Sequence, residues 1–589
     1  MVNKTRLNRV REDKDVARGV LGQFLGDETF PIEWREGEDE LFWIFDDLHC
    51  PNPLTPMFFD VGGWWLTCDH MFRRFGTPFA SDWIAKQING YLYTAAIPAD
   101  PSCRPAAEEF QARYAPRVPW DKNYAENIGP YLEATLPHYG KNFIEWWDNR
   151  LRPEIVRNFE YFDNYDMEAE SLPGLAVLFE DALDMHDRHW KIHWLVNFAQ
   201  FSATMELNAA IKELRPDLPD DLPGRLQSSL KDRNWDSIEA LWRMKEAVKS
   251  DPELGQAFKG ETATVVLAEL EKSEAGRAFV DGQLKPYQKE FGHKSMWSHE
   301  FIAPLWRENP GPIIEAVRGY LYSDYDYRAT IEAVRRDLEE AKAQLMEGIG
   351  AGEDRVRLQT LLDRAIALNP LTPDHHFYID QGTNARLRTV LMAIGAKFVQ
   401  ADILDDPEDI LFLHYNEMRT LVGNHGAFNA RELTSDRRDA FEEQQSIRPP
   451  DWVGTATEEA LAFPYAANWG FPEKFYRPAP NQSDEITGLP ASSGVVEGVA
   501  RLVTSTDQFD ELQENEILVC RMTNPAWVVL FTKIRGLVTD AGGSASHSAV
   551  IAREFGIPAV VGTSVATQAI KTGDRVRVNG TSGTVQIVR

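Results

Sequence analysis

The sequence changes in character near residue 480, and this change limits the folds that are open to the chain. Before it, long runs such as 174–201 and 327–349 carry apolar residues at helical spacing. After it, six short β-branched runs alternate with Gly and Asp turns: GVARLV, EILVC, GLVTD, PAVVG, RVRVNG and GTVQIV. We therefore expect a mainly α-helical region over 1–474, a Pro/Asn/Ser-rich linker over 475–487 and a small α/β domain over 488–589.

Charge changes at the same place. From residue 487 onward there are nine Lys/Arg and nine Asp/Glu, so the net charge of −29 belongs to the preceding region. Such an acidic surface disfavours nucleic-acid phosphates and anionic membranes. The four cysteines lack disulfide or zinc-ligand spacing, and the charged N-terminus lacks an apolar leader core. We expect a cytoplasmic protein with neither a metal site nor a membrane or nucleic-acid partner.

The stretch TDAGGSASHSAVIAREFGIPAVVG, residues 539–562, predicts a turn followed by a short helix and a buried strand. Gly542 and Gly543 permit a tight turn, and Ser544 or Ser546 is a suitable N-cap. His547 then lies in the first helical turn, where free backbone N–H groups favour an anion. The stretch is suited to hold a phosphate.

The whole tail resembles the mobile, swivelling phosphohistidine domain of enzymes related to phosphoenolpyruvate synthase and pyruvate phosphate dikinase. The matching pieces, in order, are PASSGVVEG, MTNPAWVVLF, the stretch above and TGDRVRVNGTSGTVQIV. The resemblance implies that His547 is phosphorylated and that Gly542, Gly543 and Ser546 shape the turn facing the phosphate. Ala545 stands where the plant-type dikinase has a regulatory threonine, so that control is not implied.

Imidazole chemistry agrees with this expectation. With an ordinary pKa of about 6.5, neutral imidazole is available near neutral pH as a nucleophile towards phosphorus. Thr539 and Arg553 are candidates to stabilise the transferring phosphoryl group. The alternative for Arg553 is to cap carbonyl groups at the end of its helix.

A phosphohistidine needs a source of phosphate. The 589 residues contain neither a stretch like RSSATxED, typical of the ATP-grasp domain in related enzymes, nor a GxxxxGK[ST] loop. The layout is similar to phenylphosphate synthase and the hydroxyphenyl-ketone dikinases, in which separate subunits carry the histidine and the ATP site. This similarity implies a separate ATP-grasp subunit that binds most of the ATP and Mg²⁺ or Mn²⁺.

The region before the linker resembles the substrate domain of rifampicin phosphotransferases. The pieces are NPLTPMFF, FGHKSMWSHE, DHHFYIDQGTNARLRTVLMAIG and ILDDPEDILFL. An acceptor hydroxyl needs a base or cation near its oxygen, because the deprotonated oxygen is the better nucleophile. Candidates for this role are His293, Lys294, His375, His376, Arg386 and Arg388.

A further histidine group, His186, His189 and His193, shares one helical face. Such spacing can build a metal site, but interleaved tryptophans favour a hydrogen-bonded structural cluster, in which His189 and His193 can still line a pocket. Asp60 and Asp380 are weaker site candidates, with helix capping as the alternative.

These observations predict one subunit of an ATP-dependent dikinase. Sixteen of seventeen tryptophans precede the linker and can line a flat apolar pocket, although most are expected in cores. The predicted reaction moves phosphate from His547 to a hydroxyaromatic acceptor, giving an aryl phosphate, with AMP and phosphate as co-products. The alternatives are an aliphatic-alcohol acceptor of the antibiotic-inactivating type, and a phosphocarrier or binding module without catalysis.

Overall fold

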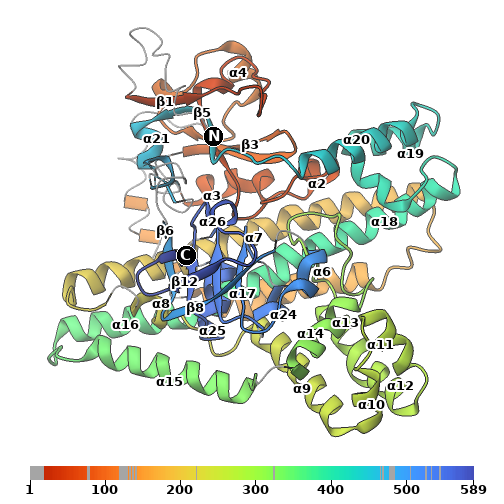
Figure 1. Cartoon of the computed structure of the whole chain (residues 1–589). Coiled ribbons are helices and arrows are strands. Elements are labelled where there is room, and N and C mark those ends of the chain that lie inside the picture. The colour runs from red at the N-terminus through yellow and green to blue at the C-terminus, as the bar shows by residue number, and fades with distance from the viewer. Residues whose placement is uncertain are drawn as a thin grey trace. The chain divides into compact units, whose positions relative to one another are not determined.

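Figure 1 shows the computed structural model of the chain. It describes residues 19–75, 80–118, 130–131, 134–135, 138–139, 142–219, 222–322, 325–463, 466, 470–471, 473–476, 485–503, 506–523, 527–531, 533–542 and 546–588. None of the helices in this part of the chain combines the length and apolar composition that a bilayer crossing requires.

The chain divides into two compact units. The first comprises Met1–Leu195, His299–Ile302 and Arg386–Ala479, and the second comprises Val196–Ser298, Ala303–Ala385 and Pro480–Arg589. The C-terminal domain therefore shares a unit with the middle of the chain. Within the expected linker, 477–484 lie outside the described residues, while helix α23 (Glu473–Tyr476) ends before them and strand β6 (Glu485–Thr487) begins after them.

An antiparallel sheet lies in the first unit, where we expected mainly helix. Its strand order is β1 (Val20–Phe24), β5 (Trp452–Thr457), β2 (Phe42–Phe45), β4 (Tyr91–Pro98) and β3 (Ala80–Ile88). Asn89 and Gly90 join β3 to β4 with φ of 48° and 84°, as in a type I′ hairpin turn. Buried aromatic side chains, including Trp43, Tyr91 and Tyr93, form the core beneath the sheet.

Helices make up most of the rest of the first unit, as the apolar spacing predicts. They include α2 (Pro56–Val61), α3 (Cys68–Phe75), α4 (Glu108–Arg113), α6 (Arg152–Asp163), α19 (Tyr415–Gly423), α20 (Ala430–Gln444) and α21 (Glu458–Ala462). The helix expected at 174–201 is longer than its pattern suggested, since α7 runs from Leu172 to Leu214 and enters the second unit. α18 (Asn384–Gln400) lies mostly in the first unit.

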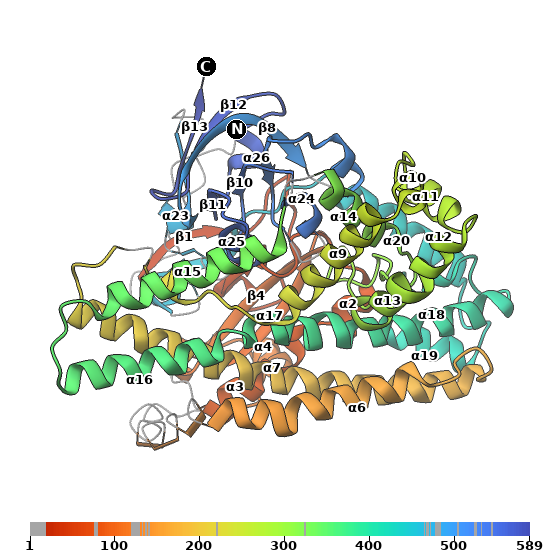
Figure 2. The same ribbon diagram turned by 90° about the horizontal axis from the view of Figure 1, so that it is seen from below.

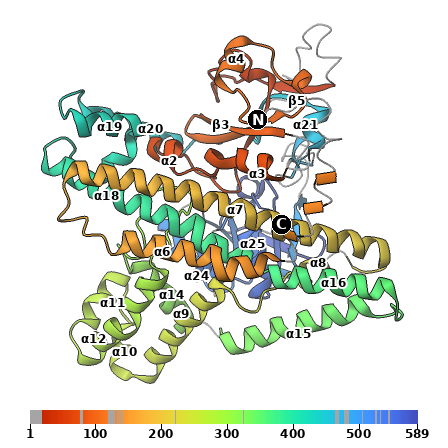
Figure 3. The same ribbon diagram turned by 180° about the vertical axis from the view of Figure 1, so that it is seen from behind.

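The second unit begins with a bundle of helices. They are α8 (Leu222–Leu226), α9 (Arg233–Ser250), α10 (Pro252–Ala257), α11 (Ala263–Leu270), α12 (Glu274–Phe279), α13 (Lys285–Phe291), α14 (Gly311–Tyr322), α15 (Tyr327–Met346), α16 (Glu353–Leu368) and α17 (Leu371–His375). α15 and α16 lie side by side (Figure 3), and leucines and alanines from both share one buried cluster. A π-helical segment, His376–Thr383, continues α17 into α18.

The C-terminal domain, also in the second unit, is the α/β domain that the sequence predicts. Its eight-stranded sheet has the order β6, β13 (Thr584–Val588), β12 (Arg575–Asn579), β8 (Val495–Val503), β9 (Ile517–Cys520), β10 (Gly536–Thr539), β11 (Ala559–Val561) and β7 (Leu489–Ser492). All six expected strands are present, and β8 to β11 are parallel. Figure 2 shows α24 (Val528–Phe531) and α25 (His547–Glu554) with this sheet.

Both faces of the parallel strands β9, β10 and β11 are buried. In β9, Leu518 and Cys520 belong to one core cluster while Ile517 and Val519 belong to another, and Leu537 and Val538 of β10 divide in the same way. Parallel strands covered on both faces read as continuous apolar runs. This explains why EILVC and GLVT are recognisable as strands in the sequence.

Candidate functional site

The turn expected to hold a phosphate lies between β10 and α25, at the carboxyl end of a parallel strand. Ser546 is the N-cap of α25, and its Oγ accepts a hydrogen bond from the Ala549 N–H at 3.4 Å. His547 is therefore the first helical residue, as the sequence predicts. Gly542 has φ of 113°, which an L side chain rarely adopts, while 543–545, including Gly543 and Ser544, lie outside the described residues.

Hydrogen bonds hold the described residues at the end of β10 and directly after it. The buried Thr539 hydroxyl donates to the Ala541 carbonyl at 2.7 Å, so it supports the backbone of the turn. Asp540 accepts from the Thr563 hydroxyl at 3.2 Å and from the Thr567 N–H at 3.1 Å. These contacts connect the loop after β10 to the loop after β11.

Two side chains of α25 bond to carbonyl or hydroxyl groups of the protein. Arg553 Nε donates to the Ala549 carbonyl, one turn earlier in α25, at 3.1 Å. The Ser548 and Thr523 hydroxyls lie 2.8 Å apart and are both buried. α25 is thus attached to the chain segment that follows β9.

α25 also contacts the helical part of the second unit. Phe555, which follows α25, stacks on Tyr325 with ring centroids 4.9 Å apart. Met296, from the FGHKSMWSHE piece, packs against both the helical core and the core of the C-terminal domain. The two parts of the unit therefore share an apolar contact. It includes a residue close in sequence to His293 and Lys294, two of the residues expected to act on the acceptor hydroxyl.

Four of the residues expected to contact the acceptor belong to the second unit and lie near Phe377, namely His293, Lys294, His375 and His376. The His293 ring lies 4.3 Å from the Phe377 ring, and Arg233 places its guanidinium carbon 4.4 Å from the same ring. Lys294 Nζ is 5.6 Å from the Phe291 ring, which lies 5.7 Å from Phe377. His375 and His376 directly precede Phe377 in the chain.

Lys294 itself is buried among aromatic side chains. Its ammonium group donates to the Ser237 hydroxyl at 2.7 Å, and Ser237 lies 2.8 Å from the Tyr287 hydroxyl. Burial, together with the nearby charge of Arg233, lowers the pKa of Lys294 to about 7. Lys294 can therefore change its charge near neutral pH.

His375 and His376 use their ring nitrogens differently. The buried His375 donates from Nδ1 to the Leu371 carbonyl at 2.7 Å. His376 donates from Nδ1 to Asp380 Oδ2, one turn later in the π-helical segment. His376 is half-exposed, whereas Asp380 is buried.

The other residues expected to contact the acceptor lie in the first unit. They are Arg386, Arg388, His189 and His193. Arg386 pairs with Asp163 and covers the Phe159 ring at 3.9 Å, and His189 lies 5.6 Å from the same ring. Separately, Arg388 donates to Glu408 Oε1 at 2.8 Å and to the Phe301 carbonyl. The His193 ring lies 4.5 Å from Trp190.

The geometry of His186 and His189 matches the hydrogen-bonded cluster that the sequence favours. His186 donates from Nε2 to the Gly62 carbonyl at 3.2 Å, and His189 Nε2 lies 3.0 Å from Asn158 Nδ2. Burial lowers the pKa of His186 to about 4 and that of His189 to about 3. Both rings are therefore neutral at physiological pH.

A buried carboxyl group that sequence reasoning missed joins two of the quoted pieces. Glu300, from FGHKSMWSHE, accepts bonds from the N–H and the hydroxyl of Thr55, from NPLTPMFF, each at 2.7 Å. Burial raises the pKa of Glu300 to about 7, against the effect of these bonds. The pieces themselves were recognisable, but their pairing across 245 residues was not.

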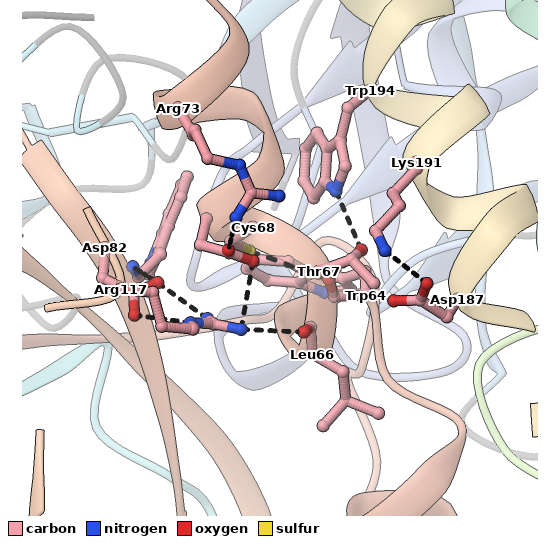
Figure 4. Close-up of polar contacts among 12 residues, drawn as sticks. Trp64, Leu66, Thr67, Cys68, Arg73, Asp82, Arg117, Asp187, Lys191 and Trp194 are labelled. Carbon is pink, nitrogen blue, oxygen red and sulfur yellow. Dashed lines mark hydrogen bonds and ion pairs between the residues drawn. The ribbon is translucent and has the colours of Figure 1, made fainter. Parts of the chain in front are cut away.

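Most of the paired tryptophans are core residues. Trp64, Trp65 and Trp147 are buried, whereas Trp146 is 38% exposed. Figure 4 shows Trp194 donating to the Thr67 hydroxyl, while Arg117 bonds to Asp82 and to the Leu66 carbonyl. Such buried polar contacts fix the orientation of the aromatic side chains.

Comparison with known proteins places two family models on the chain. Residues 512–583 match the mobile domain of the PEP-utilising enzymes, and 195–371 match the fourth domain of rifampicin phosphotransferase. Both matches fall in the second unit, except for Leu195 and the short His299–Ile302 segment, which belong to the first unit. The recognised tail and the region holding His293 and Lys294 thus both have counterparts in this group of enzymes.

Three relatives illustrate the extent of the similarity. Chondramide synthase of Chondromyces crocatus is 29% identical over 95% of this chain and 14% of its own length. An uncharacterised phosphotransferase of Bacillus subtilis is 28% identical over 67% of this chain and 47% of its own. Rifampicin phosphotransferase of Streptomyces sviceus is 30% identical over 59% of this chain and 39% of its own. The chain spans less than half the length of each.

Proposed function

We propose that His547 carries a phosphoryl group and that the protein transfers it to an acceptor hydroxyl. The matches of residues 512–583 to the mobile domain of the PEP-utilising enzymes and of residues 195–371 to a rifampicin phosphotransferase domain support this proposal. The observation that carries this proposal is the position of His547 as the first residue of α25, immediately after a turn at the carboxyl end of β10. Backbone N–H groups at a helix start are donors for phosphoryl oxygens. The carboxyl ends of parallel strands are where ligands of open α/β sheets bind.

The acceptor that we propose is a small hydroxyaromatic compound, which would leave as an aryl phosphate. The aromatic side chains around His293 and Lys294 support it, since a flat ring can pack among them. An aliphatic-alcohol acceptor is the second candidate. The match of residues 195–371 to a rifampicin phosphotransferase domain favours it.

We propose ATP as the phosphate source, with AMP and inorganic phosphate as co-products and an ATP-grasp subunit as the loading partner. The metal ion, Mg²⁺ or Mn²⁺, would act on the nucleotide there by neutralising phosphate charge. Dividing the reaction at a phosphohistidine replaces one difficult transfer by two in-line displacements. The described part of this chain would then supply the carrier histidine and the acceptor region.

Intact-mass analysis after mixing the chain with ATP, Mg²⁺ and a candidate ATP-grasp subunit tests the proposal, with AMP measured in parallel. We expect an acid-labile mass increase of one phosphate that His547→Ala abolishes. His425→Ala, which changes an exposed histidine in the first unit, is the matched control and should load normally. Phenol or rifampicin added afterwards should discharge the phosphate. Equal loading of His547→Ala and the wild type would rule out His547 as the carrier.

A further inference from the structure

We propose that His376, oriented by Asp380, is the general base that removes the proton from the acceptor hydroxyl. This inference rests on the proposed transfer from His547 and names the group that activates the acceptor. Both residues lie in the π-helical segment His376–Thr383 of the second unit, which also contains α25.

The two side chains form an oriented pair. Asp380 is 2% exposed and accepts the hydrogen bond from His376 Nδ1, whereas the His376 side chain is 42% exposed. The carboxylate therefore fixes both the ring orientation and the Nδ1–H tautomer, which leaves Nε2 as the proton acceptor. A histidine whose second nitrogen is held by a buried carboxylate has the arrangement that removes a hydroxyl proton in Ser-His-Asp triads.

Other histidines of the chain show how a structural role differs. His375 is buried and bonds to a backbone carbonyl of its own helix, and His186 bonds to the Gly62 carbonyl. His414 is half-exposed and contacts Asp60 at 3.1 Å, but Asp60 also accepts the Tyr415 N–H at the start of α19, as a helix cap does. A half-exposed ring combined with an almost fully buried carboxylate distinguishes His376 from these three.

The surrounding backbone and side chains also favour a ligand site. π-helical turns disrupt regular helix geometry and occur frequently at functional sites. Gln381, on the same segment, is 6% exposed, and its side-chain oxygen has no hydrogen-bond partner among the described residues. A buried acceptor left without a donor is energetically unfavourable, and a ligand donor would remove that cost.

Apolar contacts connect this segment to the helix that carries His547. Phe377, the residue after His376, belongs to the helical core cluster of the second unit. Phe555, at the end of α25, packs against the same cluster. The pair that we propose as the base and the helix that we propose as the phosphate carrier thus border one apolar core.

The chemical step is a single displacement at phosphorus. His376 Nε2 takes the hydroxyl proton while the acceptor oxygen forms a bond to phosphorus and the P–N bond to His547 breaks. The electron pair of that bond stays on the His547 imidazole, which takes up a proton from water. His376 then releases its proton to water, so that one hydroxyl and one phosphohistidine give one phosphate ester and one histidine.

A test that needs no partner subunit loads the chain chemically with potassium phosphoramidate. Peptide mass spectrometry locates the phosphate, and loss of the phosphopeptide containing residue 547 is followed after addition of phenol or rifampicin. The variants are His376→Gln, Asp380→Asn and their double variant. The matched control is His414→Gln, which changes the half-exposed Asp–His pair of the first unit.

We expect all variants to load at residue 547 as the wild type does. Discharge should slow about 10²- to 10⁴-fold in His376→Gln, the range that general-base catalysis supplies. Asp380→Asn should slow it as well, and the double variant should be no slower than His376→Gln, because the two side chains act as a unit. His414→Gln should match the wild type.

The possible failures are distinguishable. If His376→Gln loads and discharges at the wild-type rate, the base assignment is wrong while the transfer from His547 stands. If the phosphopeptide does not form in the wild type, or neither compound discharges it, the proposed transfer fails and the base assignment fails with it. Slow discharge in His414→Gln equal to that in His376→Gln would indicate a general structural effect and would overturn the assignment.

Discussion

Phe555 and Tyr325 stack with ring centroids 4.9 Å apart and an interplanar angle of 23°. Phe555 ends the helix that begins at His547, and Tyr325 precedes α15 in the helical part of the same unit. In addition, a Cβ at Gly224 would lie only 2.8 Å from Arg553 Nη1, so the arginine closely approaches α8. The end of α25 distant from His547 is therefore in contact with the helical part of the second unit, which also holds His293 and Lys294.

Removal of this aromatic contact should loosen α25. Stacked pairs contribute about 0.5–1.5 kcal/mol beyond buried area, which corresponds to roughly 2- to 12-fold in a local opening equilibrium. We expect Tyr325→Ala to accelerate amide hydrogen exchange in α25 by this factor, and Tyr325→Phe, which keeps the ring, to leave it unchanged. Unchanged exchange in Tyr325→Ala would show that the stacking contributes no stability.

Substitution of Gly542 should destabilise the turn before His547. An alanine there would have an unfavourable φ of 113°, and its Cβ would lie 2.8 Å from Ser546 Oγ, the N-cap atom of α25. Gly573 is the matched control, because its φ is 95° but its added Cβ meets no described atom within 4 Å. We expect Gly542→Ala to cost about 1–3 kcal/mol in urea denaturation and Gly573→Ala to cost less. If both variants lose the same free energy of unfolding, the backbone φ accounts for the whole effect and the contact with Ser546 contributes nothing.

Loss of the Thr55 hydroxyl should weaken the first unit. Thr55→Val removes the bond from this hydroxyl to Glu300 and leaves the buried carboxyl group with one donor fewer. A buried acceptor that loses its donor costs about 1–3 kcal/mol, and we expect a loss of this size in the free energy of unfolding. Thr55→Ser keeps the hydroxyl and should lie close to the wild type. A Thr55→Val protein as stable as the Thr55→Ser protein would contradict the assignment.

Lys294 should make stability depend on pH. Its pKa is lowered to about 7 in the folded protein from an ordinary 10.5, so the unfolded chain binds more protons between these values. Wild-type stability should therefore rise with pH above 7, by on the order of 1 kcal/mol per pH unit. Lys294→Met removes the buried charge, so its stability relative to the wild type should be greatest below pH 7.

Urea denaturation of both proteins at pH 6 and pH 9 measures this effect. Lys259→Met, which changes an exposed lysine of the same unit, is the control and should follow the wild type at both values. The same difference between Lys294→Met and the wild type at pH 6 and pH 9 would mean that Lys294 is not neutralised by burial.

Local sequence determined the C-terminal domain and its key turn. The runs EILVC, GLVTD and PAVVG became strands that are buried on both faces, and a segment with no polar face has a continuous apolar sequence. The other three runs became β8, β12 and β13, in which buried residues are interspersed with exposed ones. The start of α25 was predictable because an N-cap serine acts through a residue three positions away. In the first unit, Asn89-Gly90 was an equally local hairpin signal, but it was overlooked among the helical patterns.

Only the tertiary structure decided the rest, because it depends on residues far apart in the chain. β5 pairs between β1 and β2 although more than 400 residues separate it from both, and Glu300 meets Thr55 across 245 residues. The four-residue spacing of His376 and Asp380 is visible in the sequence, but their unequal exposure is not. Propensity and spacing act over one or two turns of chain, whereas the burial that sets a pKa or orients a base comes from packing between distant segments.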